Sequence, residues 1–187
     1  MRIVVGITGA SGAIYGVRLL EELRGRAGVE TFLVVSRTAA RIAEQETGRT
    51  LGDLRALADH WYDNDDLAAP IASGSFPVDA MVVAPCSVKT LSALANSYSD
   101  TLIARAGDVA LKERRPLILL VRETPLHAGH LRLMLALAEL GALIVPPIPA
   151  FYGSPRTIDD LVNHTIGRVL DHLGLEHSLY RPWTGRP

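Results

Sequence analysis

Short apolar runs alternate with segments of helical periodicity along this chain. Strands are predicted at residues 3–7, 31–35, 80–84 and 117–121, with a shorter one at 142–145. Amphipathic helices are predicted at residues 12–24, 38–47, 89–95, 102–113, 126–140 and 159–173. Alternation of this kind predicts an α/β fold, in which helices cover both faces of a mostly parallel sheet. The expected architecture is therefore a Rossmann-like or flavodoxin-like three-layer sandwich.

The composition narrows the class of protein. A chain of 187 residues, 48% hydrophobic and with a net charge of −1, is typical of one globular domain. The charge balance is unlike that of a nucleic-acid-binding protein. No apolar run approaches the roughly 18 residues needed to span a membrane, and the N-terminus does not read as a signal peptide. A single cysteine excludes an internal disulfide, and we expect a cytoplasmic protein.

A glycine-rich turn, Thr8-Gly9-Ala10-Ser11-Gly12, joins the first strand to the first helix. Gly9 and Gly12 allow a sharp turn and a close approach of a ligand to the backbone. Ser11 can cap the helix or bind a phosphate. Because a helix N-terminus favours an anion, the turn predicts a phosphate site, although a tight turn without a ligand has the same pattern.

The residues that follow the other strands support a phosphate ligand. In a parallel sheet ligands bind beyond the carboxyl ends of the strands. These ends carry hydroxyls, cations and turn residues but few acids, at positions 36–37, 85–90, 122–125 and 146–152. The five segments together, counting the first turn, predict one phosphate-binding edge of the sheet.

A nicotinamide dinucleotide is a poor match to this edge. The glycines at 6, 9 and 12 do not follow the G-x-G-x-x-G spacing, and Ser36 stands where an acid would hold the ribose. No tyrosine is followed four residues later by lysine, as a short-chain reductase would require. A mononucleotide such as FMN fits better, because one phosphate suits one hydroxyl-rich turn.

Six motifs, in the same order, resemble those of the UbiX-type flavin prenyltransferases. They lie at residues 6–12, 84–91, 105–113, 122–126, 149–152 and 167–170, and the likeness runs from residue 2 to about residue 175. The resemblance implies an FMN-binding domain at residues 1–175 and a C-terminal tail at residues 176–187. The last helix and Trp183 are expected to pack on a neighbouring subunit.

The resemblance also implies an activity. A homo-oligomer, dodecameric in the family, would transfer a dimethylallyl group from dimethylallyl phosphate to N5 of reduced FMN, with ring closure onto C6. No metal is used. The product, prenylated FMN, would serve a partner decarboxylase of the UbiD type. The sequence does not choose between a monophosphate and a pyrophosphate donor.

Roles for individual residues follow from the matched motifs. The expected FMN-binding residues are Gly9, Ala10, Ser11, Ser36, Ser87, Val88, Lys89, Thr90 and Arg122. The expected ligands of dimethylallyl phosphate are Lys112, Arg122, Tyr152 and Arg168, and the catalytic set is Ser11, Lys112, Glu123, Tyr152 and Arg168. Glu46 resembles a further acid, with a weaker match around it. Leu67 stands where the family often has a tryptophan.

These residue types suit the reaction. The departing phosphate carries roughly −1.5 to −2 charges near neutral pH, which Lys112, Arg122 and Arg168 can neutralise without a metal. The Tyr152 hydroxyl adds a hydrogen-bond donor. An electron-rich wall for the allyl cation could come from the reduced flavin or from Trp183. Ring closure must remove a proton from the flavin, and either the departing phosphate or Glu123 could accept it.

Two other functions compete with this interpretation. FMN-dependent cysteine decarboxylases share the fold, but they carry a histidine on the first helix, which this chain lacks. An FMN-binding accessory subunit would not need the second set of phosphate ligands. Cys86 is interpreted as a structural thiol, and His127 with His130 lack an evident third metal ligand.

Overall fold

The computed structural model describes residues 1–185, and Arg186 and Pro187 of the predicted tail lie outside the described residues. The chain divides into two compact units, residues 1–146 and residues 147 onward, and each is described by itself. Within the described chain, no helix has both the length and the apolar character needed to cross a bilayer.

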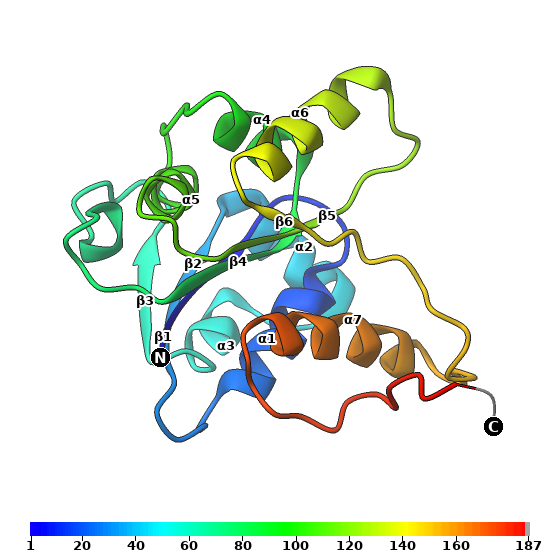
Figure 1. Ribbon diagram of the computed structural model, residues 1–187. Coiled ribbons are helices and arrows are strands. Elements are labelled where there is room, and N and C mark those ends of the chain that lie inside the picture. Colours follow the sequence, from blue (N-terminus) through cyan, green and yellow to red (C-terminus); the bar gives the residue numbers. More distant parts are fainter. Residues whose placement is uncertain (186–187) are drawn as a thin grey trace. The chain divides into compact units, whose positions relative to one another are not determined.

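The first unit is built on a six-stranded parallel sheet (Figure 1). Its strands are β1 (Arg2–Ile7), β2 (Glu30–Val35), β3 (His60–Asp63), β4 (Ala80–Cys86), β5 (Leu117–Val121) and β6 (Leu143–Ile144). They are hydrogen-bonded in the order β3-β2-β1-β4-β5-β6, and each neighbouring pair is parallel. This is the strand order of the Rossmann fold, with the order reversing between β1 and β4. The predicted α/β class is confirmed.

Helices cover both faces of this sheet, as the alternation of patterns predicts. Those of the first unit are α1 (Ala13–Leu23), α2 (Arg37–Thr47), α3 (Leu51–Arg55), the 3₁₀ turn η1 (Pro70–Ala72), α4 (Val88–Ala95), α5 (Leu102–Lys112) and α6 (Ala128–Glu139). Helices α4, α5 and α6 lie on one face, and α1, α2 and α3 on the other (Figure 1). The second unit contains α7 (Ile158–His172), which begins with a capping box between Thr157 and Asp160.

Two short elements were absent from the sequence prediction, β3 and α3. Three of the four β3 residues are exposed, so this edge strand has no apolar run and depends on pairing with β2 and on side-chain contacts such as the stacking of His60 on Phe32. Helix α3 has five residues and is held by a capping box between Thr50 and Asp53. Both elements depend on local hydrogen bonds rather than on an apolar face, and periodicity does not reveal such elements.

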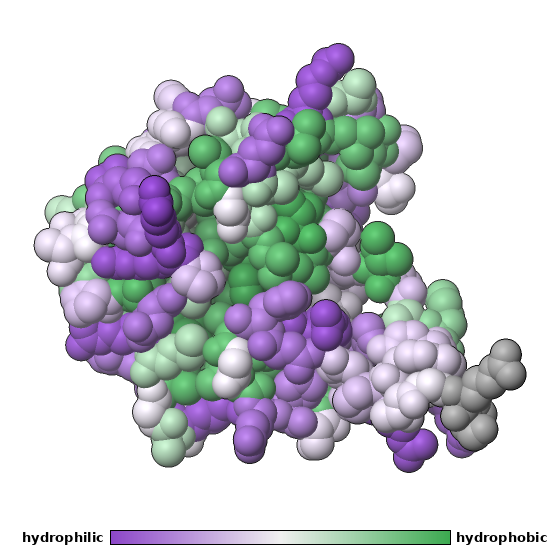
Figure 2. All heavy atoms as spheres, in the orientation of Figure 1, coloured by the Kyte–Doolittle hydropathy of each residue, from purple (hydrophilic) through white to green (hydrophobic). Residues whose placement is uncertain are grey.

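The three central strands form the core. Every residue of β4 and β5 is buried, as are Ile3 to Ile7 of β1. Parallel strands covered on both faces read as continuous apolar runs, which is why these three were predicted correctly. By contrast, α6 exposes Leu131, Leu135 and, at its end, Leu140 by 53%, 58% and 60%. Figure 2 shows apolar side chains at the surface over this helix.

Helix α1 approaches the sheet closely at Gly16. A Cβ atom at this position would lie 2.4 Å from the Ala84 carbonyl oxygen and 2.8 Å from Cδ1 of Ile7. We expect Gly16→Ala to destabilise the protein by about 1–3 kcal/mol, because the added methyl overpacks a rigid backbone contact. Chemical denaturation measures the change. Gly52→Ala in α3 is the matched control, since its methyl would meet only the Thr50 hydroxyl at 3.6 Å. Equal stabilities of the two variants would contradict the prediction.

Cys86 ends the buried strand β4 and is completely buried. Burial raises the pKa of its thiol to about 12, which agrees with a structural thiol. We therefore expect a thiol-specific reagent at pH 8 to leave the native protein unmodified. The same reagent should modify one thiol per chain in denaturant. Rapid stoichiometric reaction of the native protein would show that the thiol is accessible.

Candidate functional site

A cavity of about 1020 Å³ lies at the carboxyl ends of the strands in the first unit. The residues predicted to bind FMN that line it are Gly9, Ser36, Ser87, Val88, Lys89 and Thr90, and the predicted catalytic acid Glu123 lines it too. The cavity opens at the point where the strand order reverses, next to the end of β1. This is the position at which doubly wound α/β folds bind their ligands.

Three helices begin at the wall of this cavity, and each has a hydroxyl cap. Ser36 accepts a hydrogen bond from the Ala39 N–H (3.2 Å) at the start of α2, and Ser87 accepts one from the Thr90 N–H (3.4 Å) at α4. Thr101 caps α5 in the same way. The N-terminal ends of three helix dipoles therefore face one space, which favours an anion there.

Side chains of both charges line the cavity, so the preference for an anion comes from the helix N-termini rather than from an excess of cations. Arg37, Arg41 and Lys89 line the cavity, against the carboxylates of Asp63, Asp65, Asp100 and Glu123. Arg37 lies 3.7 Å from Asp65, but both side chains are more than four-fifths exposed. Water screens so exposed a pair, so the cation stays available to a ligand.

Thr8 links the carboxyl ends of β1 and β4, the two strands between which the strand order reverses. Its side chain is 2% exposed; the hydroxyl donates to the Pro85 carbonyl (2.7 Å) and accepts from the Ser87 N–H (2.7 Å). The Thr8 N–H also donates to the Pro85 carbonyl (3.2 Å). These bonds fix the start of α4, and with it Ser87, against the turn after β1.

Gly9 continues this turn along the wall of the cavity. A Cβ atom there would lie 2.9 Å from both Cβ and Cγ2 of Thr38 in the first turn of α2. A larger residue would push α2 away from the turn. The glycine is thus required by the approach of two backbone segments, as well as leaving room for a ligand.

The first turn of α1 already has an anion, which belongs to the protein. One carboxylate oxygen of Glu46 accepts hydrogen bonds from the N–H groups of Gly12 (2.8 Å) and Ala13 (3.0 Å). Nearby, Arg122 donates from Nε to the Ser11 carbonyl (2.9 Å), and the Ala10 N–H donates to the Thr8 carbonyl. The helix start that the sequence analysis assigned to a phosphate is therefore occupied by a side-chain carboxylate.

Glu46 is held in its charged form. Partial burial acts to raise its pKa, but hydrogen bonds from the Ser11 hydroxyl and the Gly12 and Ala13 N–H groups outweigh that effect, and the charge of Arg122 adds to them. The net result is a pKa below the ordinary value. Glu46, Ser11 and Arg122 form a charged cluster on the turn that borders the cavity.

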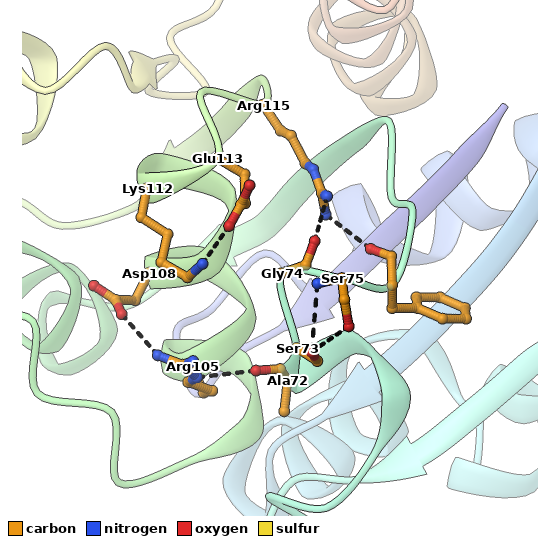
Figure 3. Close-up of polar contacts among 10 residues, drawn as sticks. Ala72, Ser73, Gly74, Ser75, Arg105, Asp108, Lys112, Glu113 and Arg115 are labelled. Atoms are coloured by element: carbon orange, nitrogen blue, oxygen red, sulfur yellow. Dashed lines mark hydrogen bonds and ion pairs between the residues drawn. The ribbon is translucent and has the colours of Figure 1, made fainter.

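Lys112 lies elsewhere in the first unit. It is the last residue of α5, whereas the other end of this 11-residue helix lines the cavity, about 16 Å away at 1.5 Å per residue. Its ammonium pairs with Glu113, next to the Ser73-Gly74-Ser75 loop (Figure 3). The structure therefore does not bring Lys112 to the cavity within its own chain.

The loop beside Lys112 is held by two arginines (Figure 3). Arg105 donates to the Ala72 carbonyl (3.0 Å) and pairs with Asp108 (3.1 Å). Arg115 donates to the carbonyls of Gly74 (2.8 Å) and Phe76 (3.0 Å). Bonds from fixed guanidinium groups make this loop a shaped surface rather than a loose connection.

The second unit carries the remaining predicted residues, Tyr152 and Arg168. Tyr152 follows the Pro-rich segment and is 47% exposed, and Arg168 lies on α7 with a half-exposed side chain. The Tyr152 hydroxyl lies 2.8 Å from Nε2 of His164, and its ring packs edge-on against Trp183, with centroids 5.8 Å apart. The two predicted phosphate ligands and the predicted aromatic wall thus belong to one compact unit.

Several lining residues were not found from the sequence. Thr101 begins a helix that follows another helix, so the rule that ligands bind beyond the ends of strands does not point to it. Asn64 was missed with β3; its carbonyl accepts from Leu102 N–H (2.7 Å) and its Oδ1 from Ile103 N–H (3.2 Å), which fixes the start of α5. The capping pattern of a hydroxyl three residues before a helical N–H is the signal that could have found Thr101.

His127 has a local structural role. Its Nδ1 accepts hydrogen bonds from the Gly129 N–H (3.0 Å) and the His130 N–H (3.4 Å), which caps α6, and the two imidazole rings are tilted by 31° with centroids 3.6 Å apart. Among residues 1–185, no group of three potential metal ligands is found.

Comparison with known proteins identifies the family. The model of the flavoprotein family matches residues 1–170. The flavin prenyltransferase UbiX of Salmonella typhimurium is 56% identical over 186 residues, which cover 98% of each chain. A dodecameric FMN-dependent UbiX-like decarboxylase from Escherichia coli O157:H7 has a TM-score of 0.97 and 51% identity over 99% of this chain and 100% of its own. A UbiX protein in complex with FMN and dimethylallyl pyrophosphate has a TM-score of 0.96 and 47% identity, over 100% of this chain and 98% of its own. This chain belongs to the flavoprotein family and, within it, to the UbiX flavin prenyltransferases.

Proposed function

We propose that this protein joins the dimethylallyl group of dimethylallyl phosphate to N5 and C6 of reduced FMN. The observation that carries the proposal is the end-to-end similarity to flavin prenyltransferases, one of which was solved with FMN and dimethylallyl pyrophosphate. In the proposed reaction the allylic C–O bond breaks, and phosphate leaves with its electron pair. The flavin gains one C5H8 unit after two new carbon bonds have formed and one proton has been released.

The cavity of the first unit fits FMN. Its volume is close to the upper end of the range for small-molecule sites, about 300–1,000 Å³. Three helix N-termini and Lys89 suit the single phosphate, and the Gly9 turn can lie against the flat ring because it has no side chain. When bound, reduced FMN would supply the two nucleophilic positions of the reaction.

Arg122, Tyr152 and Arg168 are the proposed ligands of the donor's phosphate. A guanidinium group can hold a phosphate through parallel N–H bonds, and a tyrosine hydroxyl adds a neutral donor. Fixed donors of this kind stabilise charge that develops during the reaction. Arg122 is anchored by its Nε bond to the Ser11 carbonyl, and this bond uses only one of the guanidinium nitrogens.

Lys112 is proposed to act in the site of another copy of the chain. Within its own chain it stands at the far end of α5, beside the Ser73–Ser75 loop. A similar protein of Escherichia coli is dodecameric, and the exposed leucines of α6 offer an apolar surface for assembly. We therefore propose a homo-oligomer, dodecameric as in that relative, whose sites are completed at subunit interfaces.

The recipient of the product is proposed to be a UbiD-type decarboxylase in the cytoplasm. A prenylated flavin is useful only to an enzyme that binds it as a cofactor, so this protein would act as a supplier. An FMN-binding accessory subunit would not need Tyr152 and Arg168 as phosphate ligands. The high identity to prenyltransferases disfavours a cysteine decarboxylase.

Mass spectrometry tests the proposed reaction. We expect the purified protein, incubated anaerobically with reduced FMN and dimethylallyl phosphate, to convert the flavin to a species heavier by one C5H8 unit. Arg168→Ala and Tyr152→Phe should lower the rate by about 100- to 1000-fold, the usual effect of removing a donor from a developing oxyanion. Arg156→Ala, in the same unit, is the control and should keep its rate. Bound but unmodified FMN with either phosphate or pyrophosphate donor would favour the rival functions.

A second variant tests which group accepts the flavin proton. Glu123 lines the FMN cavity, and its carboxylate accepts a hydrogen bond from the Thr124 N–H (2.9 Å). If Glu123 is the acceptor, Glu123→Gln should lower kcat by about 100-fold or more, with little change in KM for the donor. The exposed Glu44→Gln serves as the control. An unchanged kcat in Glu123→Gln would assign the proton to the departing phosphate instead.

A further inference from the structure

Tyr152 and Arg168 are linked by side chains that have no assigned role. His164 on α7 lies between them: its Nε2 is 2.8 Å from the Tyr152 hydroxyl, and its ring centroid is 4.7 Å from that of Tyr180. The Tyr180 hydroxyl in turn donates to Asp171 (2.5 Å) and accepts from Nη1 of Arg168 (3.3 Å). All five residues lie in the second unit.

Arg168 is fixed at one corner of its guanidinium group. Nη1 donates to Asp171 (3.0 Å) as well as to Tyr180. Within the described residues both contacts use the same nitrogen, so Nε and Nη2 keep their N–H donors for a ligand. Asp171 is in turn held by His177, whose Nε2 lies 3.0 Å from its second oxygen. The carboxylate therefore orients the cation without covering the side that would meet a phosphate.

His164 sets the direction of the Tyr152 hydroxyl. Burial lowers the pKa of His164, and the charge of Arg168 lowers it further, so the imidazole is neutral near pH 7. In the tautomer that carries the hydrogen on Nε2, the neutral ring donates to the tyrosine oxygen and leaves the hydroxyl hydrogen free to point at an anion. The edge-on contact with the His164 ring, at 5.5 Å between centroids, holds the tyrosine ring in the same place.

The segment after α7 can pack against this helix and complete the network because residue 167 is a glycine. A Cβ atom at Gly167 would lie 2.5 Å from Cδ1 of Tyr180 and 2.8 Å from Cε1 of His177. Any other residue there would push the segment off the helix. His177 also accepts a hydrogen bond from the Leu179 N–H (3.2 Å), which shapes the turn that leads to Tyr180. Part of the predicted tail is therefore packed against α7 by specific contacts.

We propose that His164, Asp171 and Tyr180 are positioning residues that preset Tyr152 and Arg168 as donors to the phosphate of the prenyl donor. The inference rests on the proposed function. Both side chains are half exposed, so without the network Tyr152 could change rotamer and the long Arg168 side chain could adopt many. The network restricts that freedom before the donor binds, so less conformational entropy is lost on binding.

Steady-state kinetics with reduced FMN and dimethylallyl phosphate test the network at His164. We expect His164→Ala to lower kcat/KM for dimethylallyl phosphate by about 5- to 10-fold, the effect of one lost hydrogen bond. FMN affinity and the melting temperature should stay unchanged. His164→Gln should restore most of the loss, because its amide can donate to the same oxygen. In a Tyr152→Phe background, His164→Ala should have no further effect.

Tyr180→Phe tests the other half of the network, since it keeps the ring on Gly167 and removes only the hydroxyl. A similar loss in kcat/KM is expected, and the exposed Tyr98→Phe is the matched control. If the wild-type protein forms prenylated flavin and these variants keep its kcat/KM, the positioning role is contradicted and the proposed function is not. An equal effect of His164→Ala with and without the Tyr152 hydroxyl would do the same. Failure of the wild-type protein to form prenylated flavin would instead overturn the proposed function.

Discussion

The site depends on one buried hydroxyl, that of Thr8. The strand order reverses between the paired strands β1 and β4, and the chain leaves their carboxyl ends in different directions. The two ends must therefore be fixed relative to one another. Thr8 provides this by donating to the Pro85 carbonyl and accepting from the Ser87 N–H, both at 2.7 Å. A buried hydroxyl with both partners satisfied is rigid, because breaking either bond would leave a polar group without water. The start of α4 and the glycine turn therefore form one wall.

Charge is distributed around this wall in two separate places. The cavity side collects the N-terminal ends of α2, α4 and α5, which suits a ligand's phosphate. The start of α1 is instead satisfied by Glu46, beside Arg122. An internal carboxylate keeps the α1 dipole from competing for the ligand and keeps a negative charge next to the cation. The same glycine turn thus lies between the cavity and a charged cluster that belongs to the protein.

The two compact units divide the chemistry between them. The first has the cavity and Arg122, and the second has Tyr152 and Arg168 in a network of aromatic and charged side chains. Lys112 lies at the end of α5 that is far from the cavity of its own chain, paired with Glu113. A helix with one end at a cavity and the other at a shaped surface loop suits an assembly in which neighbouring chains share their sites.

The sequence by itself determined the fold class, because β1, β4 and β5 are buried on both faces and such strands are continuous apolar runs. It also determined the family, since the six motifs keep their order, and most of the cavity wall, since ligands bind where parallel strands end. It could not find β3 or Thr101, whose positions depend on pairing and capping rather than on periodicity. Only the tertiary structure decided that Glu46 occupies the start of α1, that Lys112 lies away from the cavity, and that His164 and Tyr180 link Tyr152 to Arg168. These outcomes depend on contacts between residues distant in the chain or on rotamers fixed by packing, and neither is encoded in a local pattern.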